Sequence, residues 1–164
     1  MPLLSTCRRR RLGRATLWLA APLLAEMTGQ AERRSPDETG GMLLGWRAGA
    51  DVVVAALVGA GPGAVHERGH FHPDGAWQQQ RLQQAYLESG RTVTYLGDWH
   101  SHPRGRGRPS ATDRKTAALI AAEPAARAPE ALTLILARRW RRWRLHPYSF
   151  AQGDLRRIRL RAHD

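Results

Sequence analysis

The alternation of apolar and polar side chains predicts a chain in which strands and helices are mixed. Residues 52–58 are an unbroken apolar run within a strand expected at 52–60, and residues 132–137 are apolar apart from Thr133; both stretches are typical of strands that are buried on both faces. Residues 93–99 combine β-branched and aromatic side chains, which favour a strand. Residues 38–46 form a fourth candidate strand, which a short glycine-containing turn joins to residues 52–60.

Two segments carry the signals of helix ends. Asp74 is a suitable N-cap for a helix that runs to Glu88, and Gly90 is a suitable stop. Pro109 and Ser110 precede a second helix, expected over residues 110–122, and Asp113 stands in its first turn. Strands mixed with helices indicate an α/β protein.

The C-terminal third predicts further strands with a charged surface. Residues 138–144 are not cleanly periodic, and we expect a turn followed by a strand that carries Trp143 and Leu145. At the end of the chain three apolar residues alternate with arginines, which predicts a half-buried strand whose charged outer face protects a sheet edge. These apolar residues are Ile158, Leu160 and Ala162.

A pair of histidines after the strand at residues 93–99 is the clearest candidate chemistry. His100 and His102 are two positions apart, so on an extended chain their imidazoles leave the same face. Asp113 can supply a third ligand, because catalytic zinc sites commonly combine three protein ligands with one open position. A His-x-His pair alone also occurs by chance. Ser110 and Asp113 also have the spacing of a capping box, and a capped helix would hold the Asp113 carboxylate rigidly.

An acidic residue upstream completes a recognisable pattern. Glu38 opens the stretch Glu-Thr-Gly-Gly-Met-Leu-Leu-Gly, and a hydrolytic metal site needs such a base for its water. Glu38, then His-Ser-His, seven residues that begin with Pro103, Ser110, two residues and Asp113 resemble the JAMM (MPN-plus) metalloprotease pattern. The flanking sequences are similar to the prokaryotic JAB branch of that family, and the resemblance covers about residues 15–144.

The resemblance implies a fold and a set of roles. It implies a JAB/MPN-like, cytidine-deaminase-like α/β architecture, in which about three helices flank a mixed, curved sheet. It also implies a first strand at residues 14–19 and a helix at 22–33. One Zn²⁺ per chain would be held by His100, His102 and Asp113. Glu38 would act as the base and Ser110 would donate a hydrogen bond to the oxyanion, while Ser101 and Pro103 would support the site geometry.

The resemblance also implies a substrate class. Members of the family cut isopeptide or peptide bonds after the C-terminal glycine of ubiquitin-like proteins, and short prokaryotic members occur with conjugation enzymes in anti-phage operons. The expected partners are therefore a ubiquitin-like protein, its conjugates and the associated conjugation enzymes. Two alternatives stay open: a peptidase that processes a sulfur-carrier protein, and a nucleic-acid-binding module like the DNA-repair-associated relatives. An inactive scaffold is disfavoured, because no ligand position is lost.

Composition adds a strong positive charge to this picture. Twenty-six basic residues stand against 14 acidic ones, which gives a net charge of +12, and Lys115 is the single lysine. A positive field attracts acidic partners, including nucleic acid. The arginines are spread along the chain, which favours solvated faces over a nucleic-acid site. Residues 8–14 and 138–144 are denser, however, and the second patch interleaves arginine with tryptophan as single-strand binders do.

The single cysteine, Cys7, excludes an internal disulfide and a cysteine-based zinc site, and it fits a reducing, cytoplasmic location. Residues 8–25 imitate a signal peptide, with a basic start followed by an apolar run. That run is about 11 residues long, whereas a membrane-spanning helix needs about 20. We expect a flexible basic leader at residues 1–13, a single domain at 14–164 and no membrane association.

Three more histidines follow a Gly-Pro-Gly loop. His66, His70 and His72 surround Glu67, but their spacing fits no site of known type. Solvated loop histidines are the favoured interpretation, and a second metal site is the alternative.

Overall fold

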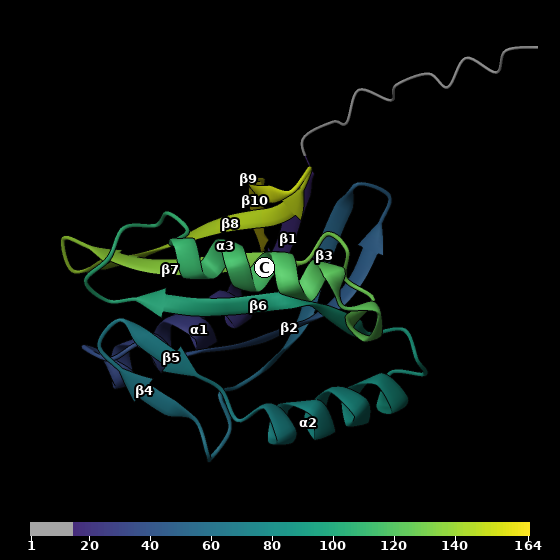
Figure 1. Cartoon of the computed structure of the whole chain (residues 1–164), viewed down its shortest axis with the longest axis horizontal. Coiled ribbons are helices and arrows are strands. Elements are labelled where there is room, and N and C mark those ends of the chain that lie inside the picture. The colour runs from purple at the N-terminus through teal and green to yellow at the C-terminus, as the bar shows by residue number, and fades with distance from the viewer. Residues whose placement is uncertain (1–14) are drawn as a thin grey trace, which may run out of the picture.

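The computed structural model describes residues 15–164 and contains one large mixed sheet with three α-helices (Figure 1). The eight strands of this sheet follow the order β10-β1-β3-β2-β6-β7-β8-β9, and β4 and β5 form a separate hairpin. The helices are α1 (Ala21–Arg34), α2 (Gly75–Glu88) and α3 (Ala111–Ala122), with a short 3₁₀ turn η1 (Pro124–Ala126). The strands are β1 (Thr16–Ala20), β2 (Gly40–Ala48), β3 (Asp51–Val58), β4 (Val65–Glu67), β5 (His70–His72), β6 (Thr94–His102), β7 (Leu132–Arg139), β8 (Arg142–Ala151), β9 (Asp154–Arg157) and β10 (Arg159–His163).

Strand β7 shows how the sheet is covered on both faces. Leu134 and Leu136 are buried in a cluster with Met27 of α1, whereas Ile135 is buried in a second cluster with Ala117 of α3. Neighbouring residues of a strand point to opposite faces, so α1 and α3 lie on opposite sides of the sheet (Figure 1). The expectation that this strand is buried on both faces is confirmed.

The sheet is strongly curved. Strands β9 and β10 follow one another along the chain with only Ile158 between them, yet they pair with opposite ends of the strand order. The backbone N–H of Ile158 donates to Pro147 on β8, and that of Arg159 donates to Ala15, next to β1. One continuous segment therefore bridges the two ends, which confirms the expected curved α/β sheet.

A bulge in β6 decides which side chains reach the α3 face. The register against β2 shifts at Leu43 and Leu44, where Gly97 and Tyr95 are the respective partners, so Leu96 is the extra residue. The Tyr95 hydroxyl donates to an Asp98 carboxylate oxygen at 2.9 Å, which shows that these two side chains, three positions apart, share a face. Bulges often re-aim side chains near functional sites.

Several sequence-based expectations need correction. The strand expected at residues 93–99 continues through His102, because the parallel ladder with β7 extends to the pair His102–Ala137. Residues 52–60 are not buried on both faces: β3 ends at Val58, and its Ala55 is exposed. The three consecutive glutamines of α2, which as polar residues would be expected to face solvent, include Gln78, whose side chain is buried and donates to the Gly59 carbonyl at 2.8 Å. Ala162 is exposed rather than half-buried.

The other predicted elements agree with the structure to within a few residues. Residues 14–19 and 22–33 correspond to β1 and α1, and the helix capped by Asp74 is α2. The apolar run at residues 15–25 contributes Leu17 and Leu19 to the core instead of forming one apolar helix. Within residues 15–164 no helix has the length and apolarity that crossing a membrane requires. The proposed leader at residues 1–13 lies outside the described residues.

Substitution of Gly97 tests whether the bulge requires close packing of β6 against β7. Its φ is +144°, and a Cβ at this position would lie 2.2 Å from the Leu132 carbonyl oxygen of β7. We predict that Gly97→Ala lowers the free energy of unfolding by about 2–4 kcal/mol, since the backbone of β6 or β7 must move. Urea titration followed by circular dichroism measures this. Gly59→Ala is the control, because its Cβ would have no neighbour nearer than 4.0 Å; equal stability of the two variants would contradict the prediction.

Candidate metal centre

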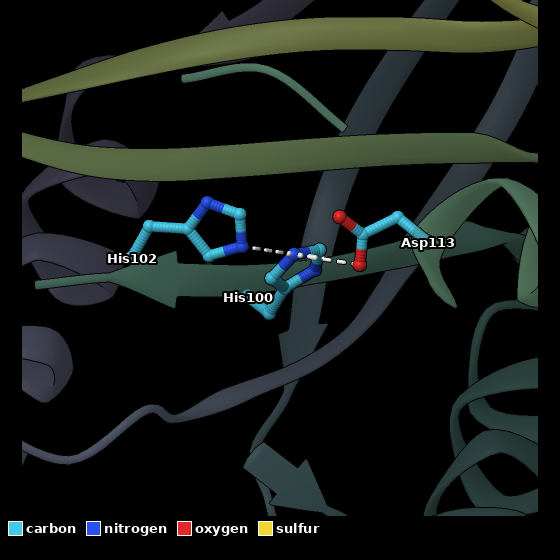
Figure 2. A group of neighbouring side chains, drawn as sticks. All are labelled: His100, His102 and Asp113. Carbon is cyan, nitrogen blue, oxygen red and sulfur yellow. Dashed lines mark hydrogen bonds and ion pairs between the residues drawn. The ribbon is translucent and has the colours of Figure 1, made fainter. Parts of the chain in front are cut away.

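Strand β6 presents two imidazoles side by side at its C-terminal end. The Nε2 atoms of His100 and His102 lie 3.0 Å apart, and their ring centroids are 4.8 Å apart (Figure 2). Because both residues belong to one regular stretch of strand, the parallel pairing with β7 fixes the backbone beneath them. The period-2 argument from the sequence is confirmed in this respect.

Asp113 reaches the same point from the first turn of α3. Its Oδ1 lies 3.2 Å from His100 Nε2, while its Oδ2 accepts a hydrogen bond from the Ser110 backbone N–H at 2.6 Å. The Ser110 hydroxyl in turn accepts from the Asp113 backbone N–H at 3.1 Å, which completes a capping box. The two predicted roles of Asp113, helix cap and candidate ligand, are thus met by different oxygens of one carboxylate.

The electrostatics of Asp113 favour its charged form. Burial raises the pKa of Asp113, but the hydrogen bond and charge interaction with His100 and the hydrogen bonds from Ser110 outweigh burial, so the pKa lies well below its usual range. The carboxylate is therefore ionised at neutral pH and available to a cation.

The three side chains form a donor set suited to a metal ion. One donor atom from each of His100, His102 and Asp113 lies within 4.8 Å of the other two, and all three residues are half-buried. Two imidazole nitrogens and one carboxylate oxygen suit a borderline divalent cation such as zinc. Within residues 15–164 this is the one group of three or more potential ligands that lies close enough together.

The outer nitrogen of His102 is held by the loop that follows. His102 Nδ1 lies 2.9 Å from the Arg106 carbonyl oxygen, which can only accept, so Nδ1 carries the proton and Nε2 is left with a free lone pair. Tyr148 on β8 anchors the next residue, because its hydroxyl donates to the Gly107 carbonyl at 2.6 Å. Gly107 also packs against His146, and a Cβ there would lie 2.1 Å from the imidazole.

Glu38 lies just before β2 and lines the same cleft as the three candidate ligands. Its backbone is fixed by the β4–β5 hairpin: the Glu38 N–H donates to the Glu67 carbonyl at 2.9 Å, and His66 Nδ1 donates to the Glu38 carbonyl at 3.0 Å. Burial raises the pKa of the Glu38 carboxyl, although His102 and His100 act to lower it. The structure thus brings Glu38 to the imidazoles across more than 60 residues of sequence.

Ser101 connects the two halves of the site. It is fully buried, and its side chain lies on the face of β6 away from the imidazoles. Its hydroxyl accepts from the Thr39 N–H at 3.0 Å, and its own N–H donates to the Thr39 carbonyl at 2.7 Å. Thr39 follows Glu38 directly, so these bonds fix the position of Glu38 relative to β6. After Pro103 the chain turns, and the Gly105 N–H donates to the His102 carbonyl.

The cleft around these residues has a volume of about 770 Å³ and contains an acid that the sequence reasoning missed. Asp98 lines it, two positions before His100 on the same face of β6. Burial raises the pKa of Asp98 to about 6, and the hydrogen bond from Tyr95 and the charge of His100 act in the opposite direction. The period-2 rule that paired the histidines would have placed Asp98 beside them.

The histidines of the β4–β5 hairpin do not form a second group of ligands. His70 and His72 are exposed and stack with ring centroids 6.4 Å apart, while His66 is half-buried on the Glu38 carbonyl. The expected loop is therefore a hairpin, and one of its histidines is part of the support for Glu38.

Comparison with known proteins places these features in a family. A family model described as "Prokaryotic homologs of the JAB domain" matches residues 20–157. A probable metalloprotease, y4qB of Sinorhizobium fredii, is 35% identical over 134 residues, which cover 80% of this chain and 82% of the relative. A CD-NTase/cGAS isopeptidase of Vibrio cholerae is 40% identical over 77 residues, 47% of this chain and 49% of the relative.

Two further matches complete the comparison. A CD-NTase/cGAS isopeptidase of Escherichia coli is 33% identical over 89 residues, which cover 53% of this chain and 57% of that protein. The solution structure of protein DSY2949 from Desulfitobacterium hafniense superimposes with a TM-score of 0.70 over 90% of this chain and 93% of that chain. At 21% identity this likeness shows a shared fold.

The anchoring of the loop behind His102 gives a testable prediction. Tyr148 is buried, and its hydroxyl holds the loop whose Arg106 carbonyl orients the His102 ring. With Zn²⁺ as the probe ion, we predict that Tyr148→Phe lowers the affinity of the candidate centre by about tenfold, in the range found when a group behind a metal ligand is removed, while the fold is kept. Competition with a chromophoric chelator measures the affinity, and Tyr86→Phe on α2 is the control. Unchanged affinity in Tyr148→Phe would show that the loop does not need this anchor.

Proposed function

The chain is a hydrolase of the prokaryotic JAB family of the JAMM metalloproteases, and from that premise we propose that it is a zinc-dependent isopeptidase or peptidase. We propose further that it cleaves after the C-terminal glycine of a ubiquitin-like protein, in conjugate removal or tail processing. The observation that carries the proposal is the convergence of His100, His102 and Asp113 within 4.8 Å, in a cleft that also holds Glu38.

His100, His102 and Asp113 are the proposed zinc ligands. Their two nitrogens and one oxygen would supply three protein donors, the number with which catalytic zinc sites commonly keep one position for water or substrate. Zinc, when bound, supplies Lewis acidity that acidifies water and polarises the substrate carbonyl. The chain itself orients the ligands, through the Arg106 carbonyl behind His102 and through the capping box at Asp113.

Glu38 is the proposed general base and acid. It would take the proton from the attacking water and return it to the leaving amine, so that its carboxyl ends the cycle unchanged. Burial raises its pKa toward the pH at which it must both accept and donate a proton, which favours this role. The hydrogen bonds at Thr39 and at the Glu38 N–H fix the backbone that carries this carboxyl.

Ser110 is the proposed donor to the oxyanion. Its hydroxyl oxygen already accepts a hydrogen bond from the Asp113 N–H at 3.1 Å, which leaves the hydroxyl hydrogen free. Ser110 lines the cleft beside Asp113, so this hydrogen can point to the negative charge that develops on a carbonyl oxygen during attack.

The proposed substrate class draws on the relatives. Two of them are named CD-NTase/cGAS isopeptidases, which supports cleavage of an isopeptide bond in a conjugate. A cytoplasmic ubiquitin-like conjugation system active in anti-phage defence is the proposed setting. A small sulfur-carrier protein with a C-terminal extension is the alternative substrate, and it would use the same site.

Glu38→Gln separates the roles of Glu38 and the metal ligands. We predict that the variant binds zinc as wild-type does but cleaves at least about 10²-fold more slowly, because the proton acceptor is lost. The assay follows cleavage of a ubiquitin-like protein extended beyond its final glycine, with an extended sulfur-carrier protein in parallel. Glu67→Gln, on the neighbouring hairpin, is the control. Cleavage at the wild-type rate by zinc-loaded Glu38→Gln would remove Glu38 from the mechanism.

A further inference from the structure

Four arginines lie around His146, on the side of the sheet that carries the metal centre. Arg106 and Arg108 line the cleft, on the loop between β6 and α3. Arg144 on β8 and Arg157 on β9 lie farther from the cleft, and all four side chains are exposed. These four residues are called the basic patch below.

His146 lies between the two arginines of the loop, Arg106 and Arg108, and the two of the sheet, Arg144 and Arg157. Gly107, between Arg106 and Arg108, packs directly against the His146 imidazole. Arg144 and Arg157 lie close enough to His146 that, after burial, their charges lower its pKa. The basic patch therefore runs from the mouth of the cleft across His146 to the end of the sheet.

The basic patch lies on the same face of the sheet as the metal centre. His146 is the cross-strand partner of Ile135, which is buried against Ala117 of α3. Arg157 is the cross-strand partner of Tyr148, which belongs to the same buried cluster. Cross-strand partners share a face, so Arg157 lies on the α3 side.

Within residues 15–164 no arginine of the basic patch forms a salt bridge with a carboxylate. The arginines with carboxylate partners there are Arg47, Arg114 and Arg138. Asp154, the acid on β9, is bonded to Arg114. Four clustered guanidinium groups without such partners create a positive potential at the mouth of the cleft and would attract an anionic surface.

The position of the basic patch favours an acidic protein segment over nucleic acid. A peptidase cleft beside the patch acts on protein, so whatever the arginines bind is held next to a scissile peptide or isopeptide bond. Proteins that bind single-stranded nucleic acid combine basic residues with exposed aromatic platforms. The aromatic residue within this patch, Tyr148, is buried and bonded to Gly107, while the exposed Trp140 lies at the β7–β8 turn.

We propose that the basic patch docks an acidic segment of the protein substrate and so holds the scissile bond at the metal centre, an inference that rests on the proposed function. Guanidinium groups bind carboxylates with two parallel hydrogen bonds, and long-range attraction would raise the rate of encounter. The substrate class is thereby narrowed to proteins that carry clustered Asp or Glu close to the cleaved bond.

The test compares two variants that lose the same charge from opposite faces. Arg144→Gln/Arg157→Gln removes two charges from the basic patch, and Arg33→Gln/Arg34→Gln removes two exposed charges from α1, on the other side of the sheet. The zinc-loaded full chain is titrated into a fluorescein-labelled peptide of about five Glu-Ser repeats. A Gln-Ser peptide of equal length and an oligothymidylate of similar length are the other probes, and anisotropy measures binding.

We expect the patch variant to weaken binding of the Glu-Ser peptide by about five- to tenfold, and the α1 variant by less than about twofold. Binding should also fall steeply as salt rises from about 50 to about 300 mM. Equal weakening by both variants, or equal affinity for the Gln-Ser peptide, would overturn the proposal, because net charge alone would then explain binding. Tighter binding of oligothymidylate through the same two arginines would also overturn it.

The assay measures binding and not cleavage, so its failure leaves the proposed hydrolytic function untouched. If the hydrolytic function fails while the Glu-Ser peptide still binds in the expected way, the basic patch is a docking surface but serves no peptidase. The two failures are therefore distinguishable.

Discussion

Asp113 has two carboxylate oxygens, and the fold uses each for a different purpose. Oδ2 accepts from the Ser110 N–H and closes the capping box that begins α3, while Oδ1 lies against His100. Because one rigid group makes both contacts, the carboxylate cannot turn away from the imidazole without losing the hydrogen bond from the Ser110 N–H that closes the capping box. The position of the Asp113 carboxylate therefore determines both where α3 begins and how the candidate ligands are arranged.

The opposite side of the site is fixed by the sheet. Strand β6 is paired on both sides, with β2 and with β7, so the backbone under the two histidines has little freedom. Buried Ser101 extends this rigidity to Glu38, because Ser101 makes two hydrogen bonds with Thr39, the residue that follows Glu38. A metal centre needs ligands that are held in position before the ion binds. Here strand pairing, a helix cap and one buried serine hold them.

Local rules predicted the parts of this site that local geometry controls. The spacing of His100 and His102 follows from the period of a strand, and the Ser110–Asp113 spacing follows from helix capping. Asp98 was missed, although the same strand period places it beside the histidines. The bulge that brings Tyr95 onto the face of Asp98 involves close packing of Gly97 against β7, a contact between strands that are far apart in the sequence. Burial of Gln78 depends likewise on the Gly59 carbonyl, which no pattern within α2 reveals. The convergence of Glu38 on the histidines followed from family resemblance, since no short-range rule joins them.

Zinc-edge anomalous diffraction from crystals of the zinc-loaded chain tests the central claim most directly. The account predicts one strong peak per chain, within about 2.0–2.2 Å of His100 Nε2, His102 Nε2 and an Asp113 oxygen. It also predicts that the Glu38 carboxylate lies within hydrogen-bonding distance of the solvent molecule in the fourth position. A peak on the β4–β5 hairpin histidines, or a Glu38 carboxylate directed away from the ion, would contradict it.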